Sequence, residues 1–498
     1  MMLRNNVLAN LAGRVWGLVS VYFFAPIYLH YLGPDAYGLV GFYSTLLGVI
    51  AFTDIGLTAT LSREMARLST VPGGESGKQN LLRTYEIIYL FLSIFIFLAV
   101  FTVSPWIARY WLKATVISVS DVTVALRWMG LAIALQMPAG LFLGGLMGLQ
   151  MQVFSNMLQI VWGMFRGFGA VALLQFVSND IVMFSVSQVA CNLAYCLLAR
   201  GYLWKSIKVT PNIARFDLQT LRSTWKYASG MALATLLSVV LTQEDKVILS
   251  KLESLSNFGY YSLAGSLAAI PLSLAGPIGS AFFPQLTSLH SLGKLDELKK
   301  IYHRGCQLIS VAIFPLVVVI AFFSRPLIVA WTGSPEIASV AGTATTLLVI
   351  GQGLQAVTVM PYYTLLSFGK LRLNIALSIA SIVIITPVLY FLILLRGMEG
   401  AGISWLLMNL ATLPFYMYIM HRTILPGEFK IWLVLDFLRP LVPALLVAGA
   451  CNFLLPSPVS RFDTIAFAGI AWLSATIASC LAIPDYRLKI FRFKRRPR

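Results

Sequence analysis

The sequence predicts an all-α integral membrane protein of about 14 transmembrane helices, arranged as two six-helix lobes in a pseudo-two-fold repeat plus two peripheral carboxyl-terminal helices. Composition is the first of three supporting observations. Of the 498 residues, 58% are hydrophobic and 11% are charged, whereas about 25% of a soluble domain is charged, and the mean hydropathy is +0.81. The other two observations are a series of long apolar runs and a set of motifs that recur at nearly constant spacing.

The apolar runs are each close to the roughly 20 residues that a helix needs to cross about 30 Å of hydrocarbon. Six precede the basic segment near residue 215, and eight follow it. Prolines inside the runs predict kinks, and they are Pro138, Pro271, Pro277, Pro284, Pro361, Pro387 and Pro414. In order, the runs cover 5–30, 37–62, 82–104, 119–148, 152–177, 181–203, 226–250, 257–289, 305–323, 338–367, 373–395, 400–420, 434–455 and 464–484.

Two pairs of motifs indicate that the first six runs are repeated by the next six. Ala36-Tyr37-Gly38-Leu39 returns as Asn257-Phe258-Gly259-Tyr260, and Asn192-Leu193-Ala194 returns as Asn409-Leu410-Ala411. Repeated bundles are typical of secondary transporters. The predicted domains are therefore a six-helix lobe over 1–204, a basic cytoplasmic linker over 205–225, a six-helix lobe over 226–424, two peripheral helices over 425–485, and a basic cytoplasmic tail over 486–498.

The distribution of Lys and Arg predicts the orientation, because positively charged loops remain on the cytoplasmic side. Most of these residues fall in the linker, the tail and alternate loops, which places both termini in the cytoplasm of a multi-pass inner-membrane protein. Membrane lipids are expected partners of the basic tail, at about 1 kcal/mol per cation, and we expect no nucleic acid to bind it. The five cysteines show no metal-binding spacing, so no metal site is predicted.

Polar residues inside the predicted spans point to a basic cavity in the first lobe. Asn10 and Arg14 share one face of the first span, and Arg14 lies about 15 Å along it. Gln159 and Arg166 share a face of the fifth span, and Arg127 enters the fourth. Each arginine costs at least about 2.5 kcal/mol to insert. Because few carboxylates lie nearby, the pattern favours an anionic ligand, although small polar residues in such spans also serve helix packing.

Three acidic residues also lie within predicted spans. They are Asp54 in the second span and Glu244 and Asp245 in the seventh. Two of them have a structural interpretation, since Asp54 could pair with an arginine and Asp245 with the adjacent Lys246. The four histidines occur at span ends or in loops, without the spacing of a metal site, and are interpreted as interfacial residues.

The chain resembles the polysaccharide-transport branch of the multidrug/oligosaccharidyl-lipid/polysaccharide exporter superfamily, above all the O-antigen and related repeat-unit flippases. The resemblance spans nearly the whole chain. It is carried by the segment Asn6 to Tyr31, by Leu32-Gly33-Pro34-Asp35-Ala36-Tyr37-Gly38, by Asp54-Ile55-Gly56-Leu57, and by Glu244-Asp245-Lys246. Fourteen spans favour this branch over the drug exporters, which usually have twelve.

The resemblance implies a flippase, not an enzyme, that moves an undecaprenyl-pyrophosphate-linked oligosaccharide to the outer leaflet by alternating access. A polysaccharide polymerase and a chain-length regulator would be partners of such a flippase. Arg14, Arg127 and Arg166 would bind the pyrophosphate, because arginine binds phosphate oxygens through a planar fork. Asn10 and Gln159 line the same predicted cavity. The resemblance also implies a coupling proton or sodium ion, for which Asp54, Glu244 and Asp245 are the candidates, and no other cofactor is expected.

Three alternative functions are retained. An ion-coupled multidrug exporter would favour acidic charge at mid-membrane. A lipid II flippase is expected to carry arginines in its eighth span, where this chain has serine and glycine. A membrane glycosyltransferase or ligase would need acids, bases or a metal site for its chemistry, and the outer loops contain no paired carboxylates.

Overall fold

The computed structural model describes residues 2–54, 56–207, 214–370, 372–455 and 460–484. Part of the predicted linker, residues 208–213, and the predicted tail lie outside the described residues. The chain divides into two compact units, Met1–Gly259 and Tyr260–Arg498, which are described separately. This division follows packing and places α7 (Leu218–Leu252) in the first unit, so the domain boundaries drawn from the repeat stay a prediction.

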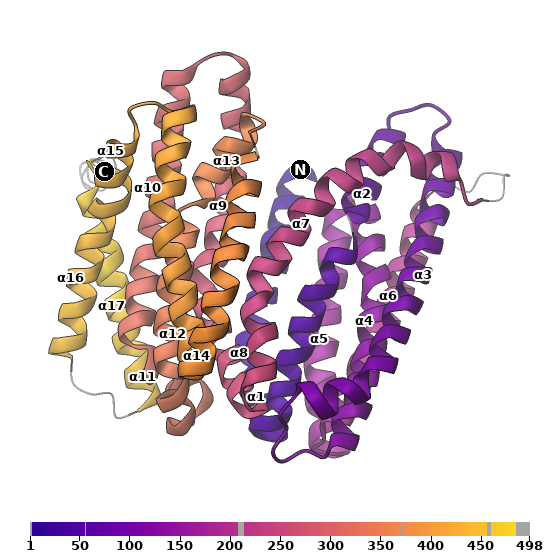
Figure 1. Ribbon diagram of the computed structural model, residues 1–498. Coiled ribbons are helices and arrows are strands. Elements are labelled where there is room, and N and C mark those ends of the chain that lie inside the picture. The colour runs from indigo at the N-terminus through magenta and orange to yellow at the C-terminus, as the bar shows by residue number, and fades with distance from the viewer. Residues whose placement is uncertain (1, 55, 208–213, 371, 456–459, 485–498) are drawn as a thin grey trace, which may run out of the picture. The chain divides into compact units, whose positions relative to one another are not determined.

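The first unit is a bundle of long helices (Figure 1). Within it α4 packs against α3 and α6, and α5 packs against α1 and α6. Its elements are α1 (Met2–Ile50), η1 (Ala51–Asp54), α2 (Leu57–Leu68), α3 (Glu75–Trp106), η2 (Ile107–Trp111), α4 (Val119–Gly148), α5 (Gln152–Phe176), α6 (Ile181–Ser206) and α7, followed by the start of α8 (Leu255–Ala268).

The long helix α1 consists of two spans separated at Gly33, whose φ of 76° lies in a region that favours glycine. Asp35 follows the break and is 3% exposed. Its carboxylate accepts hydrogen bonds from the backbone N–H groups of Thr115 and Val116, at 2.7 and 2.6 Å, and from the Ser256 hydroxyl at 2.6 Å. The turn is thereby tied to the loop before α4 and to the start of α8.

The two glycines of the repeated motif lie against each other. A Cβ atom on Gly38 would lie 2.1 Å from the Leu255 carbonyl oxygen, and one on Gly259 would lie 3.0 Å from the Gly38 nitrogen. Side chains at these positions would hold the backbones apart, because small residues are what allow membrane helices to approach closely. The motif glycine is therefore a packing requirement at the junction of α1 and α8.

The second unit is also a helical bundle, in which α10 occupies a central position in the packing. It contacts α9, α12, α16 and α17, and Cys306, Ile309 and Ile313 on it are buried in the apolar core. The elements are α9 (Ile270–Ser291), α10 (Leu295–Phe322), α11 (Ser324–Thr332), α12 (Pro335–Ala356), α13 (Val359–Ser367), α14 (Arg372–Ile424), α15 (Phe429–Ile431), η3 (Trp432–Leu438), α16 (Arg439–Leu454) and α17 (Arg461–Ala482).

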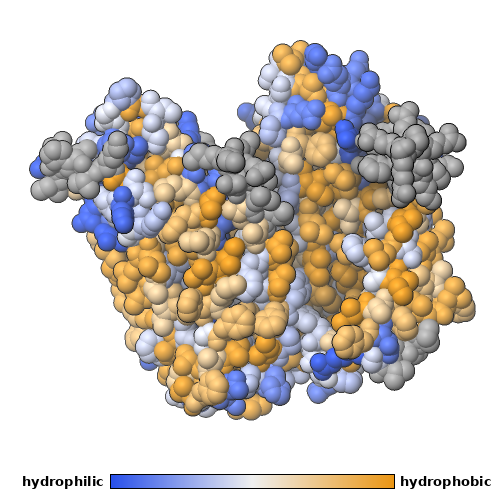
Figure 2. All heavy atoms as spheres, turned by 180° about the vertical axis from the view of Figure 1, so that it is seen from behind, coloured by the Kyte–Doolittle hydropathy of each residue, from blue (hydrophilic) through white to orange (hydrophobic). Residues whose placement is uncertain are grey.

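The helices confirm the predicted all-α membrane fold. In the described part of the chain, eleven helical stretches are long and apolar enough to cross a membrane. One of them contains the break at Gly33 and another, α14, contains a break at Gly397, so each holds two of the predicted runs. On the face shown in Figure 2, hydrophobic residues cover the middle of the helices and hydrophilic residues gather toward their ends.

Three predicted runs are subdivided. The second is interrupted at η1 and Gly56, whose φ is 69°, before α2 begins. The eighth divides into α8 and α9 near Pro271, and the tenth divides into α12 and α13 near Pro361. The interruptions near Pro271 and Pro361 agree with the predicted kinks, since proline lacks the N–H that would continue the helical hydrogen bonds. The other prolines lie inside helices, Pro138 in α4, Pro277 and Pro284 in α9, and Pro387 and Pro414 in α14.

We expect Gly38→Ala to destabilise the protein by about 1–3 kcal/mol, as overpacking of a close contact does. The added methyl group would meet the Leu255 carbonyl, which belongs to the backbone and cannot rotate away. Thermal unfolding of the purified protein measures the effect. Gly140→Ala on α4 is the matched control, because a Cβ there would meet no heavy atom within 4 Å. Equal unfolding temperatures for the two variants would contradict the packing role of Gly38.

Candidate functional site

Arg166 on α5 lies half-buried within the first unit. Its Nε donates a hydrogen bond of 2.5 Å to Gln188 Oε1 on α6. Its guanidinium group also lies over the rings of Trp162 and Tyr43, 5.2 and 5.9 Å from the ring centroids. The bond to Gln188 uses Nε and so orients the side chain, while Nη1 and Nη2 belong to the planar fork that binds phosphate oxygens.

A network of buried amides on α6 supports this arginine. Gln188 and Asn192, four residues apart on one face of the helix, are both fully buried. The Asn192 amide donates 2.8 Å to the Ala132 carbonyl on α4, and its oxygen accepts a 3.1 Å bond from the Trp162 indole. Neither residue was predicted as part of the site, although Asn192 belongs to the repeated Asn-Leu-Ala motif. Their four-residue spacing within an apolar run was the feature of the sequence that could have indicated a polar face on this helix.

Asn10 belongs to a second group of amides, where α1 and α5 begin. Asn10 Nδ2 donates 2.9 Å to Gln152 Oε1, and Asn156 Nδ2 donates 2.5 Å to Asn10 Oδ1. These bonds join the two helices. Gln159 lies half-buried on α5 between this group and Arg166.

The other two predicted arginines have different surroundings. Arg14 is exposed, and the described part of the chain shows no ion pair for it. Arg127 lies over the Phe101 ring on α3, 4.4 Å from the centroid, and its Nε is buried without a hydrogen-bond partner among the described residues. Among the described residues, the contacts of Arg127 and those of Arg166 involve different side chains.

Asp54, at the end of η1, has a defined set of donors. Its Oδ1 accepts bonds from the Thr58 hydroxyl at 2.6 Å and the Thr58 N–H at 3.3 Å, and it also accepts a bond from the Tyr89 hydroxyl. Glu244 and Asp245 are half-buried on α7, a helix that contacts η1 and α2. The adjacent Lys246 donates 3.4 Å to Gln243 Oε1.

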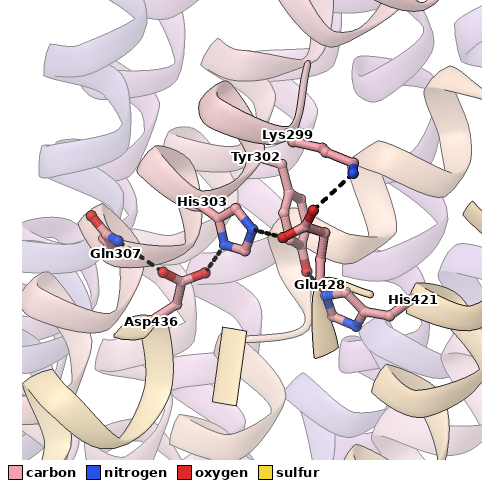
Figure 3. Close-up of polar contacts among 7 residues, drawn as sticks. All are labelled: Lys299, Tyr302, His303, Gln307, His421, Glu428 and Asp436. Carbon is pink, nitrogen blue, oxygen red and sulfur yellow. Dashed lines mark hydrogen bonds and ion pairs between the residues drawn. The ribbon is translucent and has the colours of Figure 1, made fainter. Parts of the chain in front are cut away.

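A polar cluster in the second unit joins α10 to the chain around α15 and η3 (Figure 3). His303 Nδ1 lies 2.5 Å from Asp436 Oδ2, and His303 Nε2 lies 3.2 Å from Glu428 Oε2. The second oxygens of the two carboxylates are bound by Gln307 Nε2, 2.9 Å from Asp436, and by Lys299 Nζ, 2.8 Å from Glu428. We call these five residues the His303 cluster.

The His303 cluster corrects the interpretation of the histidines as isolated interfacial residues. His303 and His421 occupy one region, since the Tyr302 hydroxyl lies 3.0 Å from His421 Nε2. The residues are far apart in sequence, so spacing alone could not reveal the cluster. Among the described residues no group of three His, Cys, Asp or Glu has the arrangement of a metal site.

Charges within the cluster affect Glu428, which lies between α14 and α15. Burial raises the pKa of its carboxyl group, but the hydrogen bonds from Lys299 and His303 outweigh this effect and leave the pKa below its usual value. Glu428 is therefore ionised at neutral pH and holds a negative charge beside His303.

A separate cavity of about 570 Å³ opens where α13, α14 and the turn between them meet. Lys370 and Arg372 supply its charged lining, and the rest is formed by Leu365, Gly369, Leu373, Ile419 and Thr423. It lies in the second unit and contains none of the predicted site residues.

The chain was compared with known protein families, curated proteins and solved structures. A family profile described as polysaccharide biosynthesis protein matches residues 30–335, which is more than half of the chain. The chain belongs to the polysaccharide biosynthesis protein family. A relative from Shigella flexneri, assigned as an O-antigen transporter, is 21% identical over 383 residues, covering 75% of this chain and 87% of its own length. This confirms the resemblance to the polysaccharide-transport branch.

Solved structures show the fold that this family member shares. The lipid II flippase MurJ, in an inward closed conformation, has a TM-score of 0.71 at 12% identity and covers 97% of this chain and 99% of its own. An inward-facing multidrug transporter of the MATE family has a TM-score of 0.64 at 14% identity, covering 82% and 96%. The family member is thus a multi-pass membrane protein with a transporter fold.

For this member of the polysaccharide biosynthesis family, we expect Arg166→Ala to reduce stability by about 1–3 kcal/mol, because it leaves the buried Gln188 oxygen without its donor. Arg14→Ala should change stability by less than about 0.5 kcal/mol, as is usual for an exposed residue without a structural partner. Thermal unfolding in the same detergent compares the two variants. An equal or larger loss for Arg14→Ala would show that Arg14 has a structural role.

Proposed function

We propose that this polysaccharide-family transporter is a flippase for an undecaprenyl-pyrophosphate-linked oligosaccharide repeat unit of O-antigen or a similar surface polysaccharide. It would carry the repeat unit from the inner to the outer leaflet of the cytoplasmic membrane by alternating access. The family match over residues 30–335 and the O-antigen transporter relative support this substrate class. The fold shared with MurJ and the MATE transporter is compatible with it.

The proposal rests mainly on the surroundings of Arg166. A guanidinium group cannot lose its proton in a protein, so Arg166 brings a permanent positive charge into a helical bundle. Among the described residues its partners are an amide and two aromatic rings, and none of these neutralises the charge. A pyrophosphate would do so, through bidentate hydrogen bonds that are stronger than those between neutral groups.

Arg14 and Arg127 are proposed as further contacts for the anionic substrate during its passage. Arg14 is exposed on α1, and Arg127 has a buried Nε without a described partner. Asn10 and Gln159 would contribute amide groups that can donate to and accept from sugar hydroxyls. Asn10 is held in place by Gln152 and Asn156.

Asp54, Glu244 and Asp245 remain the candidates for a coupling proton or sodium ion. Asp54 is the best organised of the three, because the hydroxyl oxygens of Thr58 and Tyr89 converge on its carboxylate. Oxygen atoms of this kind are ligands for hard cations, and a carboxylate can equally take up a proton. Asp54→Asn would remove the charge in either case.

We also propose that the protein lies in the inner membrane with both termini in the cytoplasm. Its function is then transport and not the catalysis of a chemical reaction. A polysaccharide polymerase and a chain-length regulator are proposed as partners that act on the translocated unit. The basic linker and tail would contact anionic lipid headgroups on the cytoplasmic side.

We expect Arg166→Ala to reduce the flipping of a lipid-pyrophosphate oligosaccharide in proteoliposomes by roughly ten- to hundredfold, the cost of losing a hydrogen bond to a charged group. Arg14→Ala and Arg127→Ala should also reduce it. Because Arg14 is exposed, its variant separates transport from folding most clearly. Protection of the labelled glycan from an added glycosidase measures the movement.

Arg422→Ala is the matched control, since Arg422 is exposed in the last turn of α14 and is not a proposed contact. It should flip the substrate at the wild-type rate. Wild-type flipping by all three test variants would contradict the pyrophosphate assignment. Transport of a cationic dye, but of no lipid-linked glycan, by the wild-type protein would instead favour the multidrug exporter.

A further inference from the structure

The polar join between α10 and η3 consists of the His303 imidazole and the Gln307 amide, both of which contact Asp436. His303 on α10 lies between two carboxylates that come from another part of the chain, Asp436 on η3 and Glu428 just before α15 (Figure 3). Asp436 is fully buried. The distances of 2.5 and 3.2 Å place both ring nitrogens within hydrogen-bond reach of a carboxylate oxygen.

The geometry requires an additional proton. An ionised carboxylate can only accept hydrogen bonds, and a neutral imidazole donates from only one of its two nitrogens. Two ionised carboxylates can therefore both be satisfied by His303 only when the ring carries two protons. The added proton can also lie on the buried Asp436 carboxyl group, 2.5 Å from Nδ1, which then donates to the ring. With Lys299 and His303 positive, and Glu428 and Asp436 negative, the cluster is then electrically balanced.

The neighbouring His421 differs in this respect. Its Nδ1 lies 2.7 Å from the Met417 carbonyl oxygen, which accepts its N–H, and its Nε2 faces the Tyr302 hydroxyl, which can donate to it. The neutral ring thus has a partner for each nitrogen, and no second proton is needed. His303, not His421, is the group whose bonds depend on protonation.

We propose that His303 is a proton-binding latch that fastens η3, and with it the start of α16, to α10 while the imidazole carries two protons. Loss of one proton removes a donor and leaves the ring lone pair facing a carboxylate oxygen. The buried Asp436 then shares the cluster with Glu428 without the balancing charge of His303, an arrangement that costs free energy in a low-dielectric interior. The join consequently loosens as pH rises.

The groups that act electrostatically on the latch come from α10, α14, the segment before α15, and η3. Gln307 keeps its bond to Asp436 in both states because its amide does not titrate. Among the described residues these groups include Lys299, Tyr302, Cys306 and Gln307 on α10, Tyr416 and His421 on α14, Glu428, and Asp436 on η3.

The latch gives the second unit a local sensor of proton concentration. Because α16 begins at Arg439, directly after η3, the latch adds a proton-dependent contact to the apolar packing of the last two helices against α10. This role is independent of the substrate carried by the protein, so it can be tested without a transport assay.

The test is amide hydrogen exchange of a peptide covering residues 428–440 in the full-length protein, at pH 6 and pH 8.5, with rates corrected for the intrinsic effect of pH. We expect the protection of this peptide in the wild type to fall by about tenfold at the higher pH, corresponding to one pKa unit of coupling. His303→Gln should give low protection at both values. His303→Arg, which cannot lose its charge, should keep high protection at both.

His290→Gln is the matched control, because His290 stacks on Phe368 and is outside the cluster. It should show the pH response of the wild type. Wild-type protection that does not change with pH would overturn the proposal, and so would a His303→Gln protein that keeps the full response. If His303→Arg does not fold, the wild type and His303→Gln still decide the outcome.

Discussion

Hydrocarbon offers no hydrogen bond to a polar group, so each buried amide, hydroxyl and charge must find its partner within the protein. This constraint explains the helices, whose backbone bonds are closed within each segment. It also explains why polar side chains inside the bundles occur in connected groups. Asn10 joins α1 to α5, Gln188 holds Arg166, and His303 joins α10 to η3. The polar contacts that fasten the helices together are also those that position charge.

The fold could be predicted from the sequence because hydrophobic length and backbone chemistry are local properties. Fourteen apolar runs became helices, and Pro271 and Pro361 lie close to the interruptions expected of them. The repeated glycine motif could be found as well. The structural reason for the motif could not be predicted, because it is the contact between Gly38 and Gly259, which lie 221 residues apart in the sequence. A close approach of two backbones is a property of packing, which a single sequence does not display.

The candidate site was predictable only in part for the same reason. Arg166 could be selected because a charge in an apolar run is unusual, but its supporting residues Gln188 and Asn192 are neutral and gave a weaker signal. Depth along a span also does not determine which neighbour a side chain meets. The contact of Arg127 with Phe101 and that of Arg166 with Gln188 could not be read from the positions of the arginines in their spans. Figure 3 brings together residues whose separation in sequence concealed their relation.

The π-helical form of η3 has a consequence for insertions and deletions. A π-helix spans one more residue in each hydrogen-bonded turn than an α-helix, so the seven residues Trp432–Leu438 hold a surplus residue. Removing one residue would let an ordinary α-helix form, and the side chains on one side of the deletion would rotate by about 100° relative to those on the other. Asp436 and α16 could not then both keep their present orientation. A one-residue change in length would therefore uncouple the buried carboxylate from the helices that follow, although the composition of the segment would hardly differ.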